Sequence, residues 1–426
     1  MIVADAALRT RLHDLFGAAV AAVSPAACMP EALPPAPPGG RRAIIAVGKA
    51  AAEMMRVAEQ RAGAPVCGLV VTRHGHLPPG WPVPGSAVEV IEAGHPVPDV
   101  ASARAAERAL AIARTLGPGD ELLVFLSGGG SALLAAPVAG VTLADKQRTT
   151  RALLRSGATI AEMNCVRKHL SAVKGGRLAV AAGGARVLTW IISDIPGDDL
   201  SFIASGPTLA DRTTLENARA IVARYVLDVP DSVHRALADP ANETPPASAP
   251  GLMDASVVLL ARARDALDSS AAMAAALGYA VLDLGDALEG EARRLGAEQG
   301  ALARQLAAGG AATAILSGGE TSVTVINPEG RGGRNLEYLL GLAIALDGHP
   351  GIAAIACDTD GIDGTEDVAG AIVTPDTLAR ARAAGIDPAA LLAANDAYVF
   401  FATLGDLVRT GPTLTHVNDF RAILIG

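Results

Sequence analysis

A run of three glycines between two serines is the feature of this sequence that points most directly to chemistry. The run follows an apolar segment at residues 121–126 and consists of Ser127, Gly128, Gly129, Gly130 and Ser131. Because glycine has no side chain, successive backbone N–H groups can converge on an anion there, and the serine hydroxyls add donors. A tight turn that needs positive φ would explain the glycines without any ligand. We predict a loop that binds phosphate or carboxylate, with a purely structural turn as the alternative.

A second glycine-rich segment follows the apolar residues 314–316 in the other half of the chain. It consists of Ser317, Gly318, Gly319 and Glu320. Two such segments, each after a predicted strand, strengthen the expectation of anion binding. Neither fits the G-x-G-x-x-G fingerprint, and the segment ending in Gly48 and Lys49 lacks the early glycine and the following Ser or Thr of a P-loop. These departures disfavour a standard Rossmann cofactor site and a P-loop.

Three cations occupy positions from which they could contact an anion. Lys49 is at a strand-to-helix corner, where the helix N-terminus repels a positive charge unless an anion shares the site. Arg331 and Arg334 lie among glycines, just before the apolar residues 336–346. Their guanidinium groups can bind phosphate or carboxylate through two hydrogen bonds, and the glycines let the backbone approach. The alternative for this pair is a solvated turn with arginine on its surface.

A basic stretch in the first half of the chain allows two interpretations. It contains Arg167, Lys168, His169, Lys174 and Arg177. These side chains could form one side of a helix that faces an anion, or they could form a solvated helix face. The residue types alone do not separate the two.

Two acidic segments follow predicted strands and could hold a metal ion. Their members are Asp194, Asp198 and Asp199 in the first segment and Asp358, Asp360 and Asp363 in the second. Mg²⁺ takes oxygen ligands and bridges to substrate phosphates, so carboxylates beside anion-binding loops suit it. Aspartate is also common at helix N-caps and in turns, so we expect several of the six to be structural. We choose Asp194 and Asp360 as metal ligands, and one of them could instead act as the general base.

The elements that must position these residues follow one repeated order. Apolar strands are predicted at residues 43–47, 121–126, 187–192 and 314–316, each followed by a turn with the candidate residues. Apolar strands that alternate with helical stretches indicate a parallel sheet covered on both faces. Such sheets bind ligands at the carboxyl ends of their strands.

A proline-rich segment at about residues 238–254 is the best candidate for a linker. It contains Pro240, Pro245, Pro246 and Pro250, which cannot continue a helix or a strand. We therefore predict an N-terminal domain at residues 1–240 and a C-terminal domain at residues 255–426. The expected fold class is α/β, with two Rossmann-like three-layer domains, mostly parallel sheets and an active-site cleft between the domains.

The composition of the 426 residues excludes several classes of protein. Half of the residues are apolar but only 3 % are aromatic, which suits helices packed on parallel strands and not an all-β recognition module. The net charge of −9 disfavours a nucleic-acid partner. No apolar run reaches the ~18 residues of a membrane-spanning helix, so we expect no membrane partner. The four cysteines are scattered singly, which disfavours zinc and indicates reduced thiols in the cytoplasm.

Seven segments, taken in order over nearly the whole chain, resemble the glycerate 2-kinase family, whose C-terminal part is called the MOFRL domain. They are Val47-Gly-Lys-Ala, Ser127-Gly-Gly-Gly-Ser-Ala-Leu, Asn164-Cys-Val-Arg-Lys-His-Leu-Ser, Ser193-Asp-Ile-Pro-Gly-Asp-Asp with Ala204-Ser-Gly-Pro-Thr, Leu316-Ser-Gly-Gly-Glu-Thr, Gly330-Arg-Gly-Gly-Arg-Asn and Asp360-Gly-Ile-Asp-Gly. The resemblance implies a two-domain kinase that uses ATP and Mg²⁺ to convert D-glycerate to 2-phosphoglycerate. It also implies that one lysine and one arginine are the main active-site cations, which would be Lys49 and either Arg331 or Arg334.

The residues expected to bind nucleotide or substrate come from both halves of the chain. They are Ser127, Gly128, Gly129, Gly130, Ser131, Ser317, Gly318, Gly319, Glu320, Asn335 and Asn418, and the catalytic set is Lys49, Arg331, Arg334 and Asp194. The chain departs from the family pattern at Leu414, where a glycine is usual, and at His416, where an asparagine is usual. We expect this C-terminal segment to return to the cleft.

Two other functions are kept as alternatives. One is an NAD(P)H-dependent hydroxypyruvate reductase, a label that members of this family have often carried, and the other is a non-catalytic protein that binds a small acid. The absence of a G-x-G-x-x-G turn counts against the reductase. A homodimer is kept as an open expectation, because no residue pattern decides the oligomeric state.

Overall fold

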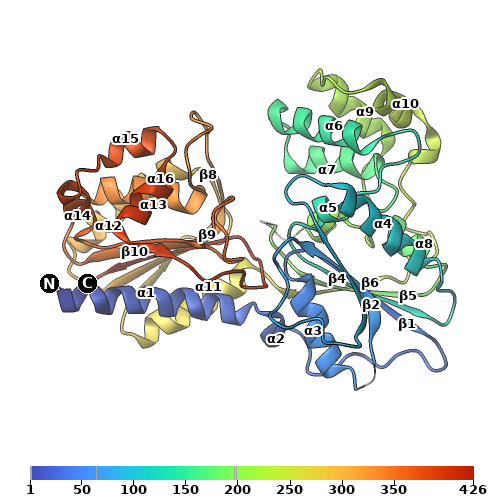
Figure 1. Ribbon diagram of the computed structural model, residues 1–426, viewed down its shortest axis with the longest axis horizontal. Coiled ribbons are helices and arrows are strands. Elements are labelled where there is room, and N and C mark those ends of the chain that lie inside the picture. Colours follow the sequence, from blue (N-terminus) through green and yellow to red (C-terminus); the bar gives the residue numbers. More distant parts are fainter. Residues whose placement is uncertain (1, 64, 196, 198) are drawn as a thin grey trace. The chain divides into compact units, whose positions relative to one another are not determined.

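The computed structural model describes residues 2–63, 65–195, 197 and 199–426, and it divides into two compact units (Figure 1). The first unit is Cys28–Leu260, and the second combines Met1–Ala27 with Ala261–Gly426. Each unit has its own sheet and its own hydrophobic core. No helix in the described part of the chain is long and apolar enough to cross a membrane.

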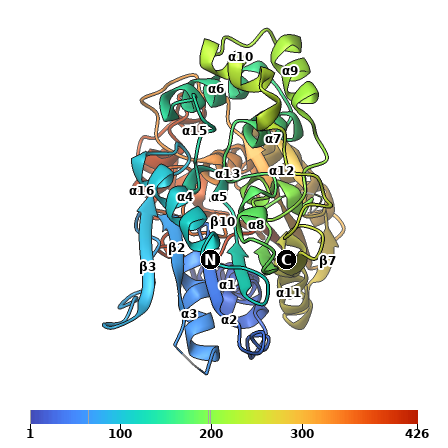
Figure 2. The ribbon, with the colours of Figure 1, turned by 90° about the vertical axis from the view of Figure 1, so that its right-hand side faces the viewer.

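The first unit is built on a six-stranded sheet with the order β3-β2-β1-β4-β5-β6. The strands are β1 (Arg42–Val47), β2 (Cys67–Arg73), β3 (Ala87–Ala93), β4 (Glu121–Leu126), β5 (Arg186–Ile192) and β6 (Ser256–Ala261). The pairs from β3 to β5 are all parallel, as the strand and helix pattern predicted. Figure 2 shows β3 at one edge of this sheet, beside β2.

Helices cover both faces of the first sheet (Figure 1). One face packs on α3 (Ala51–Arg61), and the other packs on α4 (Val100–Ala113) and α8 (Arg177–Ala181). A separate apolar cluster joins four further helices. These are α6 (Leu143–Ser156), α7 (Ile160–His169), α9 (Leu215–Arg224) and α10 (Asp231–Ala238), and the shorter pieces of the unit are α5 (Gly130–Leu133), η1 (Leu200–Ser205) and η2 (Pro240–Asn242).

The second unit has a sheet with the order β12-β11-β10-β13-β9-β7, and β8 pairs with β9 off this path. Its strands are β7 (Ala280–Asp283), β8 (Leu288–Glu291), β9 (Thr313–Ser322), β10 (Ile352–Asp358), β11 (Gly370–Val373), β12 (Leu407–Val408) and β13 (Asp419–Ile425). The helices α1 (Ile2–Ala22) and α11 (Ala263–Ala276) lie on one face, and α12 (Ala292–Ala307) and α13 (Arg334–Leu346) lie on the other (Figure 1). The remaining helices are α2 (Pro25–Cys28), at the boundary between the units, and α14 (Thr377–Ala383), α15 (Pro388–Ala393) and α16 (Ala397–Leu404).

The prediction of mostly parallel strands is wrong for the second sheet. Only β7 and β8 run parallel to β9, whereas β9, β13, β10, β11 and β12 form antiparallel neighbours. The strands β9 and β10 do share a direction, because α13 crosses over between them as predicted. The C-terminal strand β13 inserts between them in the opposite direction, and its local sequence carries no signal for that direction.

The two units also differ from the predicted division at residues 240 and 255. The helix α1 packs in the second unit, where Phe16 lies 5.9 Å from Phe420 between ring centroids. The proline-rich segment 238–254 is part of the first unit, because Leu252 is buried in its core and β6 completes its sheet. Prolines prevent regular structure but do not prevent a segment from packing.

Candidate functional site

The turns that follow β1 and β4 contact each other, because neighbouring parallel strands end at the same edge of the sheet. The backbone N of Lys49 donates to the carbonyl of Gly128 at 2.9 Å, and that of Ala50 donates to Ser127 Oγ at 3.0 Å. A Cβ at Gly48, where φ is +129°, would lie 2.2 Å from Ser127 Oγ, so glycine is required there. The structure thus brings Lys49 together with the triple-glycine turn.

The stem of Lys49 and the ring of His95 lie against this turn. A Cβ built on Gly129, which has φ of +82°, would meet His95 Cδ2 at 3.0 Å and Lys49 Cγ at 3.4 Å. Lys49 is only 7 % exposed. The turn therefore presents backbone without side chains next to one cation and one imidazole, which is an arrangement suited to a phosphate or carboxylate group. His95 follows β3, and its residue type alone did not single it out.

The two serines of the turn differ in their surroundings. Ser127 is fully buried and its hydroxyl accepts the Ala50 hydrogen bond, so it ties the two turns together. Ser131 is half-buried, and its hydroxyl is hydrogen-bonded to that of Ser205 at 2.5 Å. Of the two, Ser131 is the better placed to reach a ligand, and a ligand contact by either remains a prediction.

Of the described aspartates in the first acidic segment, Asp194 is the remaining candidate ligand. Asp194 follows β5 and is half-buried. Asp199 caps the 3₁₀ helix η1, where its carboxylate accepts from the backbone N of Ser201 at 3.0 Å. Asp198 lies outside the described residues. Asp199 is one of the aspartates with a structural role, as expected for several of the six.

In the second unit, Arg334 begins α13 and contacts three carboxylates. Its Nε donates to Asp419 Oδ1 and its Nη2 donates to Asp358 Oδ2, both at 2.9 Å, while Nη1 donates to Glu320. Burial alone would lower the pKa of Arg334, but these carboxylates outweigh it and hold the pKa well above its usual value. Arg334 is therefore a fixed cation at the carboxyl ends of β10 and β9.

Arg331 has a different environment from Arg334. Its guanidinium carbon lies 3.9 Å from the ring centroid of Tyr398, and Nη2 donates to Glu366 at 2.5 Å. Its side chain is 53 % exposed. Arg331 is half-exposed, stacks on an aromatic ring and pairs with one carboxylate, whereas the less exposed Arg334 contacts three carboxylates. Arg334 is therefore the stronger candidate for the active-site arginine.

The prediction of a second anion-binding loop is wrong, because the segment is part of a strand. Ser317, Gly318, Gly319 and Glu320 lie inside the strand β9, which continues to Ser322. In that strand Gly319 pairs with Asp419 of β13 and with Leu288 of β8. A Cβ at Gly319 would lie 2.2 Å from the Leu288 carbonyl, so the glycine permits a close approach of backbone and does not open a loop. Glu320 still reaches the candidate site, through Arg334.

The helix α13 is held at its N-terminus by Asp363. The carboxylate of Asp363 accepts from the backbone N of both Asn335 and Leu336 at 3.0 Å. Burial raises the pKa of Asp363 to about 7. Asn335 is fully buried, and its amide donates to Asp419 Oδ1 at 2.8 Å. Both residues thus orient the carboxylates around Arg334, and a direct ligand contact by Asn335 remains a prediction.

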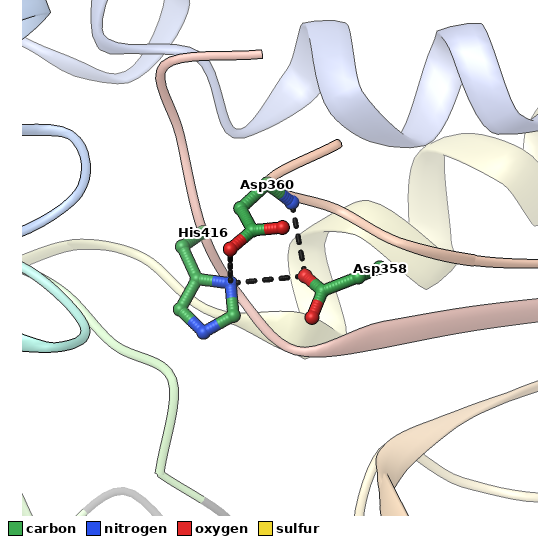
Figure 3. A group of neighbouring side chains, drawn as sticks. All are labelled: Asp358, Asp360 and His416. Atoms are coloured by element: carbon green, nitrogen blue, oxygen red, sulfur yellow. Dashed lines mark hydrogen bonds and ion pairs between the residues drawn. The ribbon is translucent and has the colours of Figure 1, made fainter. Parts of the chain in front are cut away.

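Three buried side chains at the end of β10 converge on one point (Figure 3). They are Asp358, Asp360 and His416, whose possible ligand atoms all lie within 4.8 Å of one another. His416 Nδ1 is 3.2 Å from Asp358 Oδ1 and 3.9 Å from Asp360 Oδ2. The backbone N of Asp360 donates to the same Asp358 oxygen at 3.0 Å, so the two aspartates form one rigid turn.

These three residues fit a divalent cation. Two carboxylate oxygens and one imidazole nitrogen form a donor set that Mn²⁺ and similar ions accept, whereas Mg²⁺ prefers oxygen alone. The structure places the predicted ligand Asp360 beside Asp358, from the same acidic segment, and His416, and metal binding by all three remains a prediction. Asp194, the other predicted ligand, belongs to the first unit. Asn418 lies next to the group, where its carbonyl accepts from the Thr359 hydroxyl at 2.7 Å.

A cavity of about 250 Å³ in the second unit borders Arg334. Thr321, Val323, Val325, Gly330, Gly332, Gly333, Arg334, Glu337, Gly364, Asn395 and Ala397 line it. The glycines of the predicted Arg-Gly-Gly-Arg segment thus form part of its wall, as expected if the backbone approaches a ligand there. The cavity is large enough for part of a nucleotide or for a small acid.

Comparisons with known proteins identify the family of this chain. Residues 11–238 match the family described as "Domain of unknown function (DUF4147)", and residues 313–419 match the MOFRL family. A D-glycerate 2-kinase of Thermotoga maritima is 39 % identical over 88 % of both chains, and human glycerate kinase is 33 % identical over 98 % of this chain and 93 % of its own. A protein of Agrobacterium vitis, provisionally named hydroxypyruvate reductase, is 51 % identical over 99 % of this chain and 95 % of its own.

A solved structure gives the same result for the fold. The crystal structure of a glycerate kinase from Thermotoga maritima matches 99 % of this chain and 100 % of its own, with a TM-score of 0.84 and 36 % sequence identity. The fold is therefore shared over essentially the whole chain. The chain belongs to the glycerate 2-kinase family with a MOFRL domain.

Proposed function

We propose that this protein is a glycerate 2-kinase, which transfers the γ-phosphoryl group of ATP to the C2 hydroxyl of D-glycerate. The observation that carries the proposal is the contact between Lys49 and the triple-glycine turn, where a buried cation and bare backbone adjoin. The names of the relatives in Thermotoga and human support the same reaction. Positioning and charge stabilisation are most of what phosphoryl transfer requires of a protein.

In the proposed reaction, the hydroxyl oxygen of glycerate attacks the γ-phosphorus, and ADP leaves with the electrons of the broken P–O bond. The Lys49 ammonium neutralises charge on the transferred phosphoryl group. Arg334 offsets the negative charges of Asp358 and Asp419 in the second unit and holds both carboxylates in position. Asp194 or Asp360 accepts the hydroxyl proton. In the second unit, Asp358, Asp360 and His416 would hold a divalent ion that binds with the nucleotide. Mg²⁺ would use the two carboxylates, and the imidazole would favour Mn²⁺ over it.

The alternative of a hydroxypyruvate reductase is supported by the name of the 51 % identical relative. A nicotinamide dinucleotide needs a glycine-rich turn after the first strand, with an acidic residue for the ribose about 20 positions later. The turn after β1 has a single glycine, Gly48. Gly48 packs against Ser127, so it leaves no open space for a cofactor at that point. We therefore place the reductase second, and a non-catalytic small-acid-binding protein third.

A pair of assays separates these functions. The first follows ADP formation from D-glycerate, ATP and Mg²⁺, and the second follows NADH or NADPH oxidation with hydroxypyruvate. We expect turnover only in the first assay, and ³¹P NMR of the product should show 2-phosphoglycerate. Turnover only in the second assay would contradict the proposal, and turnover in neither would favour the binding protein. A signal from 3-phosphoglycerate would move the reaction to the C3 hydroxyl.

Location and assembly remain proposals. Cys67, Cys165 and Cys357 are free thiols, which fits a reducing compartment such as the cytoplasm. A homodimer stays a prediction, to be checked by measuring the mass of the protein in solution.

A further inference from the structure

Among the described residues, the ammonium groups of two buried lysines in the first unit have backbone carbonyls as their hydrogen-bond partners. Lys174 is 1 % exposed, and its Nζ donates to the carbonyls of Ser131 at 3.0 Å and Ala204 at 3.3 Å. Lys146 is 5 % exposed, and its Nζ donates to the carbonyl of Leu170 at 3.4 Å. Neither ammonium has a carboxylate partner among the residues that the structure describes. A buried cation without a counter-ion is costly, so these positions require an explanation.

A third cation, Arg167 of α7, adds to the same group. Burial, with smaller contributions from the positive charges of Arg167 and Arg177, lowers the pKa of Lys146 to about 7. Burial also lowers the pKa of Lys174, followed by the charges of Lys146 and Arg167. Within the described ranges, Arg167 has no hydrogen bond or ion pair. The three cations therefore lie close enough to repel one another, with nothing in the described chain to balance them.

The neighbouring basic residues of α7 show that the chain can balance such charges. Lys168 pairs with Asp211 at 3.2 Å, and His169 Nε2 lies 2.9 Å from Glu243 Oε1. The basic stretch seen in the sequence is thus divided into two parts. Lys168 and His169 contact carboxylates, and Arg177 donates to backbone carbonyls such as that of Asn242 at 2.7 Å. Arg167 and Lys174 have no carboxylate partner among the described residues, and Lys146 of α6 shares this property.

A chain of neutral polar groups connects these cations to the triple-glycine turn. Ser205 Oγ donates to Asn164 Oδ1 at 3.0 Å and accepts from Ser131 Oγ at 2.5 Å. Asn164 is 2 % exposed and lies three residues before Arg167, on the same side of α7. With its oxygen used, the Asn164 amide has N–H donors that bond to no described residue. Donors and positive charge thus collect beside Ser131.

We propose that Lys146, Arg167 and Lys174, together with Asn164, form a binding site for an oxyanion next to the triple-glycine turn. A phosphate group or a carboxylate would supply the missing negative charge and accept the unused hydrogen bonds. Ser131 and Arg167 are both half-buried, so a ligand can reach the group from their side. The site adds to the proposed kinase function, because it assigns a ligand to three cations that have no role in the proposed reaction. Only the identification of that ligand as part of a substrate rests on the proposed function.

Calorimetric titration of the full chain tests this site directly. The probes are inorganic phosphate, D-glycerate and ADP, each without a second substrate. Arg167→Gln and Lys146→Met should weaken at least one probe about tenfold, whereas Arg151→Gln should not, because Arg151 is exposed on the same helix as Lys146. A loss confined to glycerate identifies the carboxylate as the ligand group, and a loss confined to ADP and phosphate identifies the phosphoryl group.

Thermal unfolding distinguishes this role from a structural one. Without ligand, Lys146→Met should unfold at a higher temperature than the parent protein, because it removes an unbalanced buried charge. It should also lose the stabilisation that the bound probe gives to the parent. Unchanged affinities for all three probes in Arg167→Gln and Lys146→Met would overturn the proposal, as would a parent protein that binds none of them. These titrations involve no turnover, so failure of the kinase assay is a separate result.

Discussion

Asp358 lies between Arg334 and His416, and each of its two oxygens contacts one of them. Oδ2 accepts from Arg334 Nη2 at 2.9 Å, and Oδ1 is 3.2 Å from His416 Nδ1. One carboxylate thus joins the fixed guanidinium to the candidate metal site. A change of charge at Arg334 should alter ion binding at Asp358, Asp360 and His416, because Arg334 and His416 contact the same Asp358 carboxylate.

Replacing Lys49 should remove most of the activity while leaving the fold intact. For Lys49→Met we expect kcat to fall on the order of 10²-fold, by comparison with the loss of one preorganised donor in other enzymes. The methionine retains the apolar stem that packs on Gly129. Steady-state kinetics and a thermal unfolding curve check the two parts. Near-parental turnover would remove Lys49 from the active site.

Arg334 and Arg331 should respond differently to the same substitution. Arg334→Lys keeps the charge but cannot contact three carboxylates at once, so kcat should fall at least about tenfold. Arg331→Lys serves as the matched control and should lose less, because Arg331 stacks on Tyr398 in a half-exposed position. Equal losses in the two variants would contradict the choice of Arg334.

His416 should set the metal preference of the second unit. In His416→Asn the imidazole nitrogen is replaced by an amide, so affinity for Mn²⁺ should fall several-fold more than affinity for Mg²⁺. Asp360→Asn should weaken both ions, because it removes a carboxylate from the same group. Electron paramagnetic resonance of Mn²⁺, with Mg²⁺ as competitor, measures both without turnover. If neither variant changes Mn²⁺ binding, these residues are not ligands.

Asp363 should matter for stability through the helix α13. Asp363→Ala leaves the backbone N–H groups of Asn335 and Leu336 without their acceptor, and caps of this kind contribute about 1–2 kcal/mol. Asp363→Asn should recover most of the loss, because an amide oxygen can cap the same groups. Urea unfolding of the three proteins checks this. An Asn variant as unstable as the Ala variant would show that the negative charge matters more than the cap.

The buried Lys146 should make stability depend on pH. Its pKa is about 7 in the folded protein because of burial, and near 10.5 when unfolded, so the unfolded chain binds more protons between these values. The stability of the parent relative to Lys146→Met should therefore rise between pH 7 and pH 10, by up to about 1.4 kcal/mol per pH unit. Below pH 7 the difference should be largest and constant. A difference that does not vary with pH would show that the ammonium is not desolvated.

The local elements were readable from the sequence. Each predicted strand at residues 43–47, 121–126 and 187–192 is present within one residue, and the glycines that follow the first two strands do form turns. Such elements depend on apolar runs and on backbone conformations that only glycine adopts easily, and both are written in consecutive residues. The pairing of Lys49 with the triple-glycine turn follows from them, because parallel neighbours place their carboxyl ends together.

The contacts among distant residues depended on the tertiary structure. The sequence at Gly318 and Gly319 predicted a loop. These residues lie in the strand β9, because β8 and β13 pair with its backbone on both sides. Lys146 carried no signal, since a lysine in a helix is usually solvated.

The sequence by itself determined the α/β elements, the turn at Lys49 and the family. The tertiary structure decided which residues meet. His416 reaches Asp358 because Asp419, three residues later, pairs with Asp358 in the register of β13 against β10. Strand register is a property of two segments and the core they share, so residues more than fifty positions apart enter one site only when the whole sheet has formed.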